Sequence, residues 1–109
     1  PRKVLAEGET VFKEGAAAAS AFLIQDGEVE IYRTVDGQKT VLASLGKGSL
    51  FGEMALIDSK PRAAAAQAKT MTTVVVVTRA MFQEKLAKCD PFIRALLKIL
   101  SDTIRRAQK

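Results

Sequence analysis

Polar and apolar residues alternate along the first two thirds of the chain, in short runs that end at glycine-containing turns. Alternation with a period of two is typical of a strand that has one face on a core. Asp26-Gly27 and Asp36-Gly37 predict two hairpin turns, because glycine adopts the positive φ that such turns require. The pattern predicts strands over residues 10–13, 21–25, 28–33, 39–45, 63–68 and 72–78.

Short strands of this kind, with glycine turns at regular spacing, favour a mainly β fold, here followed by C-terminal α-helices. We expect an antiparallel β-roll, jelly-roll-like and with about seven or eight strands, in which a short helix follows Glu53. The residues expected to face the interior are Val11, Phe12, Phe22, Ile24, Val29, Ile31, Leu42, Leu45, Phe51, Met54, Leu56, Val75 and Val77.

The hydrophobic period lengthens to that of a helix after Thr78, which can cap a helix over residues 79–88. Asp90-Pro91 is a second start signal, an N-cap followed by proline at the first helical position. We expect one domain over residues 1–109, with the roll at about 7–78 and helices at about 79–89 and 91–109. The apolar stripe of the last helix either packs onto the roll, which we slightly favour, or forms a dimer seam. Its residues are Ile93, Leu96, Leu97, Leu100, Ile104 and Ala107.

The composition narrows the chemistry that is available. The chain has 109 residues, no histidine and one cysteine, Cys89, which excludes a zinc site, a histidine-based triad and an internal disulfide. A reducing, cytoplasmic setting is the simple interpretation. No apolar run approaches the roughly 20 residues that span a bilayer, so we expect no membrane segment. The start at Pro1, within what reads as ordered sequence, is expected of a piece of a longer protein.

The net charge of +5 raises the possibility of nucleic-acid binding, but its distribution argues against it. The basic excess lies largely on residues 94–109, where a solvated helix face accounts for it. The chain has neither zinc-finger spacing nor an aromatic RNA-binding motif, so we expect no direct contact with nucleic acid. We assign no function to the alanine run 16–19, although four alanines are unusual in a turn.

The most informative segment is 51–64, with the sequence Phe-Gly-Glu-Met-Ala-Leu-Ile-Asp-Ser-Lys-Pro-Arg-Ala-Ala. The guanidinium of Arg62 offers paired donors that match phosphate oxygens. The carboxylate of Glu53 is an acceptor only, which suits a hydroxyl, and Gly52 lets the backbone approach a ligand closely. Without ligand, Glu53 and Arg62 could pair with each other, so that neither charge is buried alone. The segment therefore predicts a site for a ligand with both hydroxyls and a phosphate.

This segment closely resembles the phosphate-binding cassette of cyclic-nucleotide-binding domains, and the resemblance extends over most of residues 7–78. It implies that Gly52 and Glu53 contact the ribose and that Arg62 contacts the phosphate. The backbone amides of Met54, Ala55 and Ala63 would complete the phosphate shell. The full ligand-binding set that the resemblance implies is Phe51, Gly52, Glu53, Met54, Ala55, Arg62, Ala63 and Ala64.

The resemblance says less about the base. A hydroxyl directly after the arginine favours cGMP in this family, so Ala63 implies cAMP as the ligand, with cGMP less favoured. Val41 and Leu50 could line the base pocket or belong to the core. Arg105 could stack on the purine, or it could lie at a solvated helix end.

The resemblance thus implies a cAMP sensor that signals through its C-terminal helices, needs no cofactor and is not an enzyme. No nucleophile with a base is apparent, and no second carboxylate accompanies Glu53. The alternatives are a ligand-free scaffold in which Glu53 and Arg62 are only structural, or the sensor part of a larger DNA-binding regulator, channel or kinase. The expected partners are the cyclic nucleotide and an effector domain or a second copy bound through the C-terminal helix.

Overall fold

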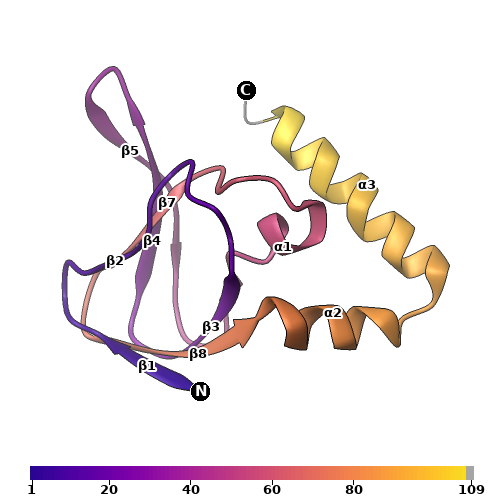
Figure 1. The fold of residues 1–109 in the computed structure, drawn as a ribbon. Helices are drawn as coiled ribbons and strands as arrows, with labels where there is room; N and C mark the ends of the chain where they lie inside the picture. Colours follow the sequence, from indigo (N-terminus) through magenta and orange to yellow (C-terminus); the bar gives the residue numbers. More distant parts are fainter. Residues whose placement is uncertain (108–109) are drawn as a thin grey trace.

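The computed structural model describes residues 1–107, which fold into two antiparallel sheets with three helices beside them (Figure 1). The strands are β1 (Arg2–Leu5), β2 (Thr10–Phe12), β3 (Ser20–Asp26), β4 (Val29–Val35), β5 (Gln38–Leu45), β6 (Leu50–Phe51), β7 (Ala65–Ala68) and β8 (Thr72–Thr78). The helices are α1 (Met54–Asp58), α2 (Arg79–Ala87) and α3 (Pro91–Ala107). The predicted antiparallel roll with a short helix and two C-terminal helices is confirmed.

The two sheets have the strand orders β1-β8-β3-β6 and β2-β7-β4-β5. Of the two predicted hairpins only the second forms: Asp36-Gly37 joins β4 to β5, which pair from Val29 opposite Leu45 to Val35 opposite Gln38. The hairpin predicted at Asp26-Gly27 is wrong, because this turn leads from β3 in one sheet to β4 in the other and the two strands do not pair. Both sheets turn one face inward, and the buried cluster between them consists of Leu5, Ile24, Val29, Phe51, Ala66, Ala68 and Val74. The aromatic rings of Phe12, Phe22 and Phe51 pack together at one end of this core, with centroids 5.4–6.1 Å apart. This end of the core lies directly beneath the segment that carries Arg62.

Three further predictions about the strands were wrong. The roll begins earlier than residue 7, because β1 pairs with β8 and buries Leu5 completely. Leu42 is 47% exposed, since a β-bulge opposite Ile31 and Tyr32 leaves it without a partner in the register and shifts the alternation of β5. In β8 the fully buried valine is Val74, so Val75 and Val77 were placed on the wrong face.

Capping fixes the starts of both C-terminal helices. The Thr78 hydroxyl accepts a hydrogen bond from the Met81 amide at 3.2 Å, which confirms the predicted cap of α2. The Asp90 carboxylate accepts from the Phe92 amide at 2.7 Å, and Pro91 occupies the first position of α3. The predicted end of this helix at Lys109 lies outside the described residues.

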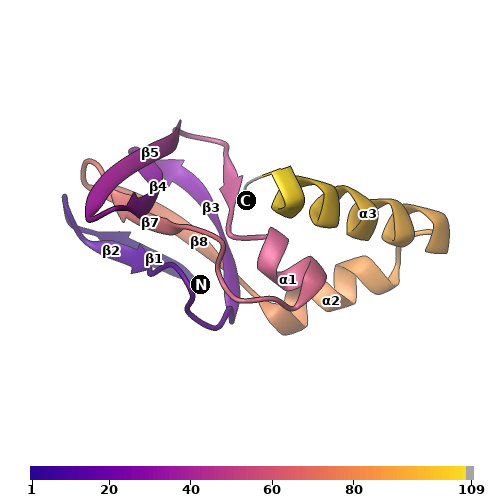
Figure 2. The ribbon, with the colours of Figure 1, turned by 90° about the horizontal axis from the view of Figure 1, so that it is seen from above.

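Helix α3 lies beside α1 in both views, so that α1 separates part of it from the roll (Figures 1 and 2). The only buried residue of α3 is Ser101, a polar one. The expectation that its apolar stripe packs onto the roll is therefore wrong. The exposed apolar residues of α3 are Phe92, Ile93, Leu96, Ile99, Leu100 and Ile104. None of the helices within residues 1–107 is long and apolar enough to cross a membrane.

Candidate functional site

The site is built around Arg62, which follows α1 and is only 6% exposed. Its two terminal nitrogens donate to backbone carbonyls, Nη1 to Gly52 O at 2.6 Å and Nη2 to Ser20 O at 2.5 Å. The guanidinium also lies 4.0 Å from the centroid of the Phe12 ring, within the range of a cation–π interaction. These contacts hold the side chain in one orientation, between the cassette and the start of β3.

The charge of Arg62 has no carboxylate partner within residues 1–107. The expected ion pair with Glu53 does not form in this structure, although the negative charge of Glu53 acts favourably on Arg62 from a distance. Burial lowers the pKa of Arg62, and the nearby charge of Arg79 lowers it further. In addition, Arg62 Nε is buried and has no hydrogen-bond partner in the described protein. A buried cation with an unused donor is the arrangement that a bound anion would complete.

Gly52 is required at its position by geometry. Its φ of +81° lies in the region that residues with a side chain rarely adopt. A Cβ atom there would lie 2.8 Å from Arg62 Nη1 and 3.2 Å from Phe12 Cε2. Glycine therefore allows the backbone to pass close enough for Gly52 O to accept from Arg62.

The residues after Gly52 begin α1. Glu53 occupies the N-cap position, and its carbonyl accepts from the amides of Leu56 and Ile57 at 3.0 and 3.1 Å. The amides of Met54 and Ala55 precede these first helical hydrogen bonds, which leaves them directed out of the first turn. Ala55 is buried and Met54 half-buried.

The remaining residues of the predicted ligand-binding set have different environments. Phe51 belongs to the core. Its ring stacks on that of Phe22 at 5.4 Å, which agrees with the expectation of core packing. Ala63 is half-buried and Ala64 buried, and both lie between Arg62 and the start of β7. The structure thus brings Gly52 and Arg62 into direct contact and places the rest of the set on the two segments that flank them.

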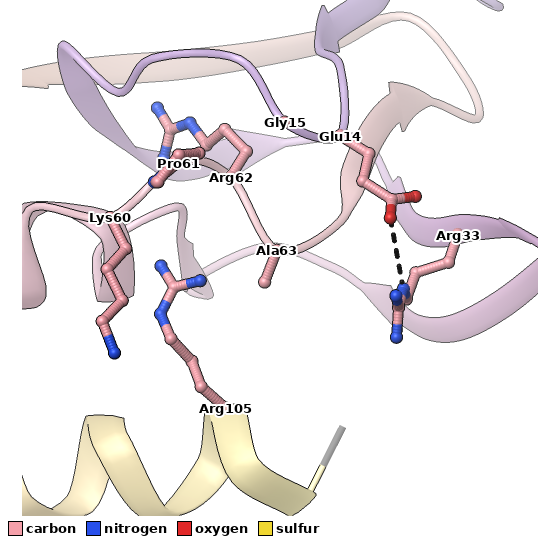
Figure 3. A pocket seen from close by; sticks show the side chains of 8 residues that line it. All are labelled: Glu14, Gly15, Arg33, Lys60, Pro61, Arg62, Ala63 and Arg105. Atoms are coloured by element: carbon pink, nitrogen blue, oxygen red, sulfur yellow. Dashed lines mark hydrogen bonds and ion pairs between the residues drawn. The ribbon is translucent and has the colours of Figure 1, made fainter. Parts of the chain in front are cut away.

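A cavity of about 460 Å³ opens beside Arg62 and Ala63 (Figure 3). Its lining is rich in cationic side chains, and Glu14 and Arg33 form an ion pair of 3.4 Å on one wall. The lining residues are Glu14, Gly15, Arg33, Lys60, Pro61, Arg62, Ala63 and Arg105. Figure 3 shows Arg105 reaching from α3 toward the segment between Lys60 and Ala63, while the Arg62 side chain points away from Arg105.

The predicted base-pocket residues do not come together. Val41 and Leu50 are exposed, and neither is among the residues that line this cavity. Arg105 does line it, but its guanidinium is bound to Asp58 in a two-point ion pair. The sequence-based alternative that Arg105 lies at a solvated helix end is therefore wrong.

Sequence reasoning missed the role of residues 16–20, which hold two arginines through backbone carbonyls. Ala16 O accepts from the Arg62 amide at 2.9 Å, and Ser20 O accepts from the Arg62 side chain. Ala18 O accepts from Arg79 Nη2 at 2.8 Å, and Ala19 O accepts from the Arg79 amide at 3.0 Å. Because backbone groups make these contacts, an alanine run carries no side-chain signal for them.

Residues 2–89 match the model of a protein family described as cyclic nucleotide-binding domain. The cyclic AMP receptor protein of Thermus thermophilus is 31% identical over 107 residues, which cover 97% of this chain and 50% of that protein. The regulatory subunit of cAMP-dependent protein kinase from Emericella nidulans is 36% identical over 87 residues, covering 80% of this chain and 21% of that subunit. The chain therefore spans half or less of the length of these curated relatives.

Solved structures of similar fold include nucleotide-bound forms of one enzyme. The cAMP-bound form of the EAL enzyme Bd1971 matches with a TM-score of 0.94 and 33% identity, over 98% of this chain and 29% of that chain. The cGMP-bound form of the same enzyme matches with a TM-score of 0.93, also at 33% identity and over 98% of this chain and 29% of that chain.

Proposed function

The chain belongs to the cyclic nucleotide-binding domain family, and from this premise we propose that it senses cAMP, with cGMP less favoured, at residues 51–64. The observation that carries the proposal is Arg62, a buried cation that has no carboxylate partner and an unused Nε donor within residues 1–107. A phosphate bound beside Arg62 would neutralise this charge and add an acceptor for the guanidinium. The relatives that bind or respond to cAMP support the class of ligand.

The charges around the cavity support a singly charged phosphate. Apart from Arg62, each cation of its lining has a carboxylate within 4.0 Å, which offsets its charge. The pairs are Arg33 with Glu14, Lys60 with Asp102, and Arg105 with Asp58. A cyclic phosphodiester carries one negative charge and matches the charge of Arg62, whereas a terminal phosphate carries about −1.5 to −2 at neutral pH.

The other contacts follow the family pattern. In this proposal the Glu53 carboxylate accepts from the ribose 2′-hydroxyl, and the amides of Met54, Ala55 and Ala63 donate to the phosphate. Ala63 offers no hydroxyl to a guanine, which is the basis for proposing cAMP over cGMP. The preference needs a direct test, because a relative with the same fold has both a cAMP-bound and a cGMP-bound form.

Isothermal titration of the purified chain with cAMP, cGMP and linear AMP tests this function. We expect saturable one-to-one binding that is tightest for cAMP and weakest for AMP. If a folded sample gives no heat and no thermal shift with either cyclic nucleotide, the proposal fails and the domain is a ligand-free scaffold of the same fold. Equal affinity for cAMP and AMP would refute the charge argument.

We also propose that the domain performs no catalysis itself and acts on a partner through α3. The exposed apolar stripe of α3 favours a protein partner, either an effector domain or a second copy of this chain. Relatives of this chain include a cyclic AMP receptor protein, kinase regulatory subunits and an EAL enzyme, so the effector could differ in class from one such protein to the next. Sedimentation analysis of the purified chain with and without cAMP distinguishes the two kinds of partner, because only binding of a second copy produces a dimer of this chain alone. We place the protein in the cytoplasm, in keeping with its single free thiol at Cys89.

A further inference from the structure

Asp58, the last residue of α1, gathers four hydrogen bonds although its side chain is only 1% exposed. It accepts from both Nε and Nη2 of Arg105, the second at 3.2 Å, and from the Ser101 hydroxyl at 3.0 Å. The amide of Lys60 also donates to it, at 3.0 Å. Burial alone would raise the pKa of the Asp58 carboxyl, but the hydrogen bonds from Arg105, Lys60 and Ser101 and the charge of Arg105 lower it. The carboxylate is therefore ionised and fully satisfied at neutral pH.

These contacts are the main attachment of α3 to the rest of the domain. Ser101 is the only buried residue of α3, and the apolar stripe of the helix is exposed except for Leu97, which is half-buried. One further contact, the ion pair of Lys60 with Asp102 at 3.7 Å, lies at an exposed position, where such pairs contribute little. Because most of the apolar stripe is exposed, the polar contacts of one carboxylate do much to fix the position of α3 over the cassette.

The same contacts decide what Arg105 can do in the cavity. Asp58 takes the Nε and Nη2 edge of the guanidinium, which fixes its plane and leaves the Nη1 edge for the cavity that Arg105 lines. Figure 3 shows this side chain reaching from α3 to the segment between Lys60 and Ala63. Arg105 is therefore oriented as a hydrogen-bond donor to a ligand beside Ala63. Because Asp58 holds its guanidinium, Arg105 is not free to stack on a purine base.

We propose that Asp58 is a positioning residue, which holds α3 on the cassette through Arg105 and Ser101 and thereby makes Arg105 a wall of the ligand site. The inference rests on the proposed function, because it needs a ligand in this cavity. A ligand that contacts Arg105 binds better when α3 is docked, and by linkage it strengthens the docking of α3 by the same factor. Asp58 thus couples occupancy of the site to the position of the C-terminal helix.

The test compares Asp58→Asn with Asp102→Asn. Both variants remove one negative charge from the contact between α3 and the cassette, but among the described residues Asp102 forms an ion pair with Lys60 alone, at an exposed position. cAMP affinity is measured by isothermal titration, and the docking of α3 by hydrogen exchange of residues 91–107 with and without cAMP. For Asp58→Asn we expect cAMP to bind about 5- to 150-fold more weakly, the range typical of coupled sites. We also expect faster exchange of α3 and loss of the protection that cAMP gives it.

For Asp102→Asn we expect affinity within about twofold of the wild type and unchanged protection. If Asp58→Asn binds cAMP as well as Asp102→Asn does, or if cAMP still protects α3 in it, the positioning role is refuted while the proposed function stands. If the wild type itself does not bind cAMP, the proposed function fails. If the wild type does not bind cAMP, the role of Asp58 in attaching α3 can still be tested without ligand. It would be overturned if hydrogen exchange of α3 were as slow in Asp58→Asn as in the wild type.

Should Asp58→Asn fail to fold, as judged by circular dichroism, Arg105→Lys decides instead. Lysine keeps the charge but cannot bind both carboxylate oxygens in the fork geometry. We expect affinity about threefold or more below the wild type and faster exchange of α3. Wild-type values for both measurements would refute the inference.

Discussion

Replacement of Arg62 by glutamine separates its role in binding from its role in the fold. The change removes the buried charge but keeps an amide that can still donate to one of the two carbonyls, Gly52 O or Ser20 O. The structure predicts opposite consequences for the two roles. The stability of the domain without ligand should change little, while the affinity for cAMP should fall steeply.

The magnitudes follow from the contacts of Arg62. Loss of a hydrogen bond to a charged group costs about 1.5–3 kcal/mol, and loss of the cation–π contact with Phe12 about 0.5–2 kcal/mol. Against this, the variant no longer buries a charge without an ion-pair partner, which relieves a penalty of several kcal/mol. We expect the two effects to cancel to within about 2 kcal/mol of the free energy of unfolding. Affinity should fall by about 2–5 kcal/mol, or roughly 30-fold to several thousand-fold.

Urea unfolding without ligand and isothermal titration with cAMP measure the two quantities on the same preparation. Arg2→Gln is the matched control, because it makes the same substitution at an exposed position on β1. Its affinity and stability should stay close to those of the wild type. Binding of cAMP by Arg62→Gln within about threefold of the wild type would refute the assignment of Arg62 to the phosphate. A loss of more than about 4 kcal/mol of stability would show that Arg62 is chiefly a structural residue.

Three further predictions concern Gly52, Ala63 and Asp58. Gly48→Ala should cost about 1–2 kcal/mol of unfolding free energy because Gly48 has a positive φ. Gly52→Ala should cost at least about 1 kcal/mol more, since a Cβ at residue 52 also meets Arg62 while one at residue 48 meets nothing within 4 Å among the described residues. Urea unfolding of both variants measures the difference, and equal costs would contradict the prediction. Ala63→Ser should improve cGMP binding relative to cAMP by about 3- to 10-fold, the value of one added hydrogen bond, as measured by competitive titration; an unchanged ratio would remove Ala63 from the basis of selectivity. The contribution of Asp58 to stability is the unfolding free energy of the wild type minus that of Asp58→Asn, measured by urea unfolding at several pH values. It should be fully present above the ordinary pKa of 3.8 and should vanish as the pH falls through the lowered pKa of the folded state. A difference that grows toward acid pH would show that folding shifts this pKa in the opposite direction.

The fold could be predicted from the sequence where local signals decide it. Alternation and the turn at Asp36-Gly37 locate the β4–β5 hairpin, and capping by Thr78 and Asp90 locates the C-terminal helices. The turn at Asp26-Gly27 has the same local signal but passes the chain from one sheet to the other, which only the strand pairing decides. The phase of β8 could not be predicted, because in a run of four valines either alternate set could face inward. Similarly, a bulge in β5 is set by its partner strand and leaves no mark on β5 itself.

The candidate site could be predicted as a set of residues but not as a set of contacts. The family pattern identifies Gly52, Glu53 and Arg62, and chemistry alone suggested that the two opposite charges could pair. In the structure, Arg62 instead donates to the carbonyls of Gly52 and Ser20. Carbonyls are present at every residue, so nothing in the sequence distinguishes the two that accept. The contacts of Asp58 were missed for another reason, since Ser101 and Arg105 lie 43 and 47 residues away in the chain.

The two faces of α3 connect these observations. Amphipathicity predicts that a helix buries its apolar face, yet α3 is attached through Ser101 and Arg105 on its polar side. An exposed apolar stripe is costly in water unless a partner covers it, so the stripe is better explained as a contact surface than as part of the core of this domain. Since Asp58 fixes the orientation of α3 relative to the cassette, it also fixes the direction in which the stripe faces. A ligand that strengthens the Asp58 attachment would therefore present the stripe to a partner in one orientation, and without ligand the stripe would sample several.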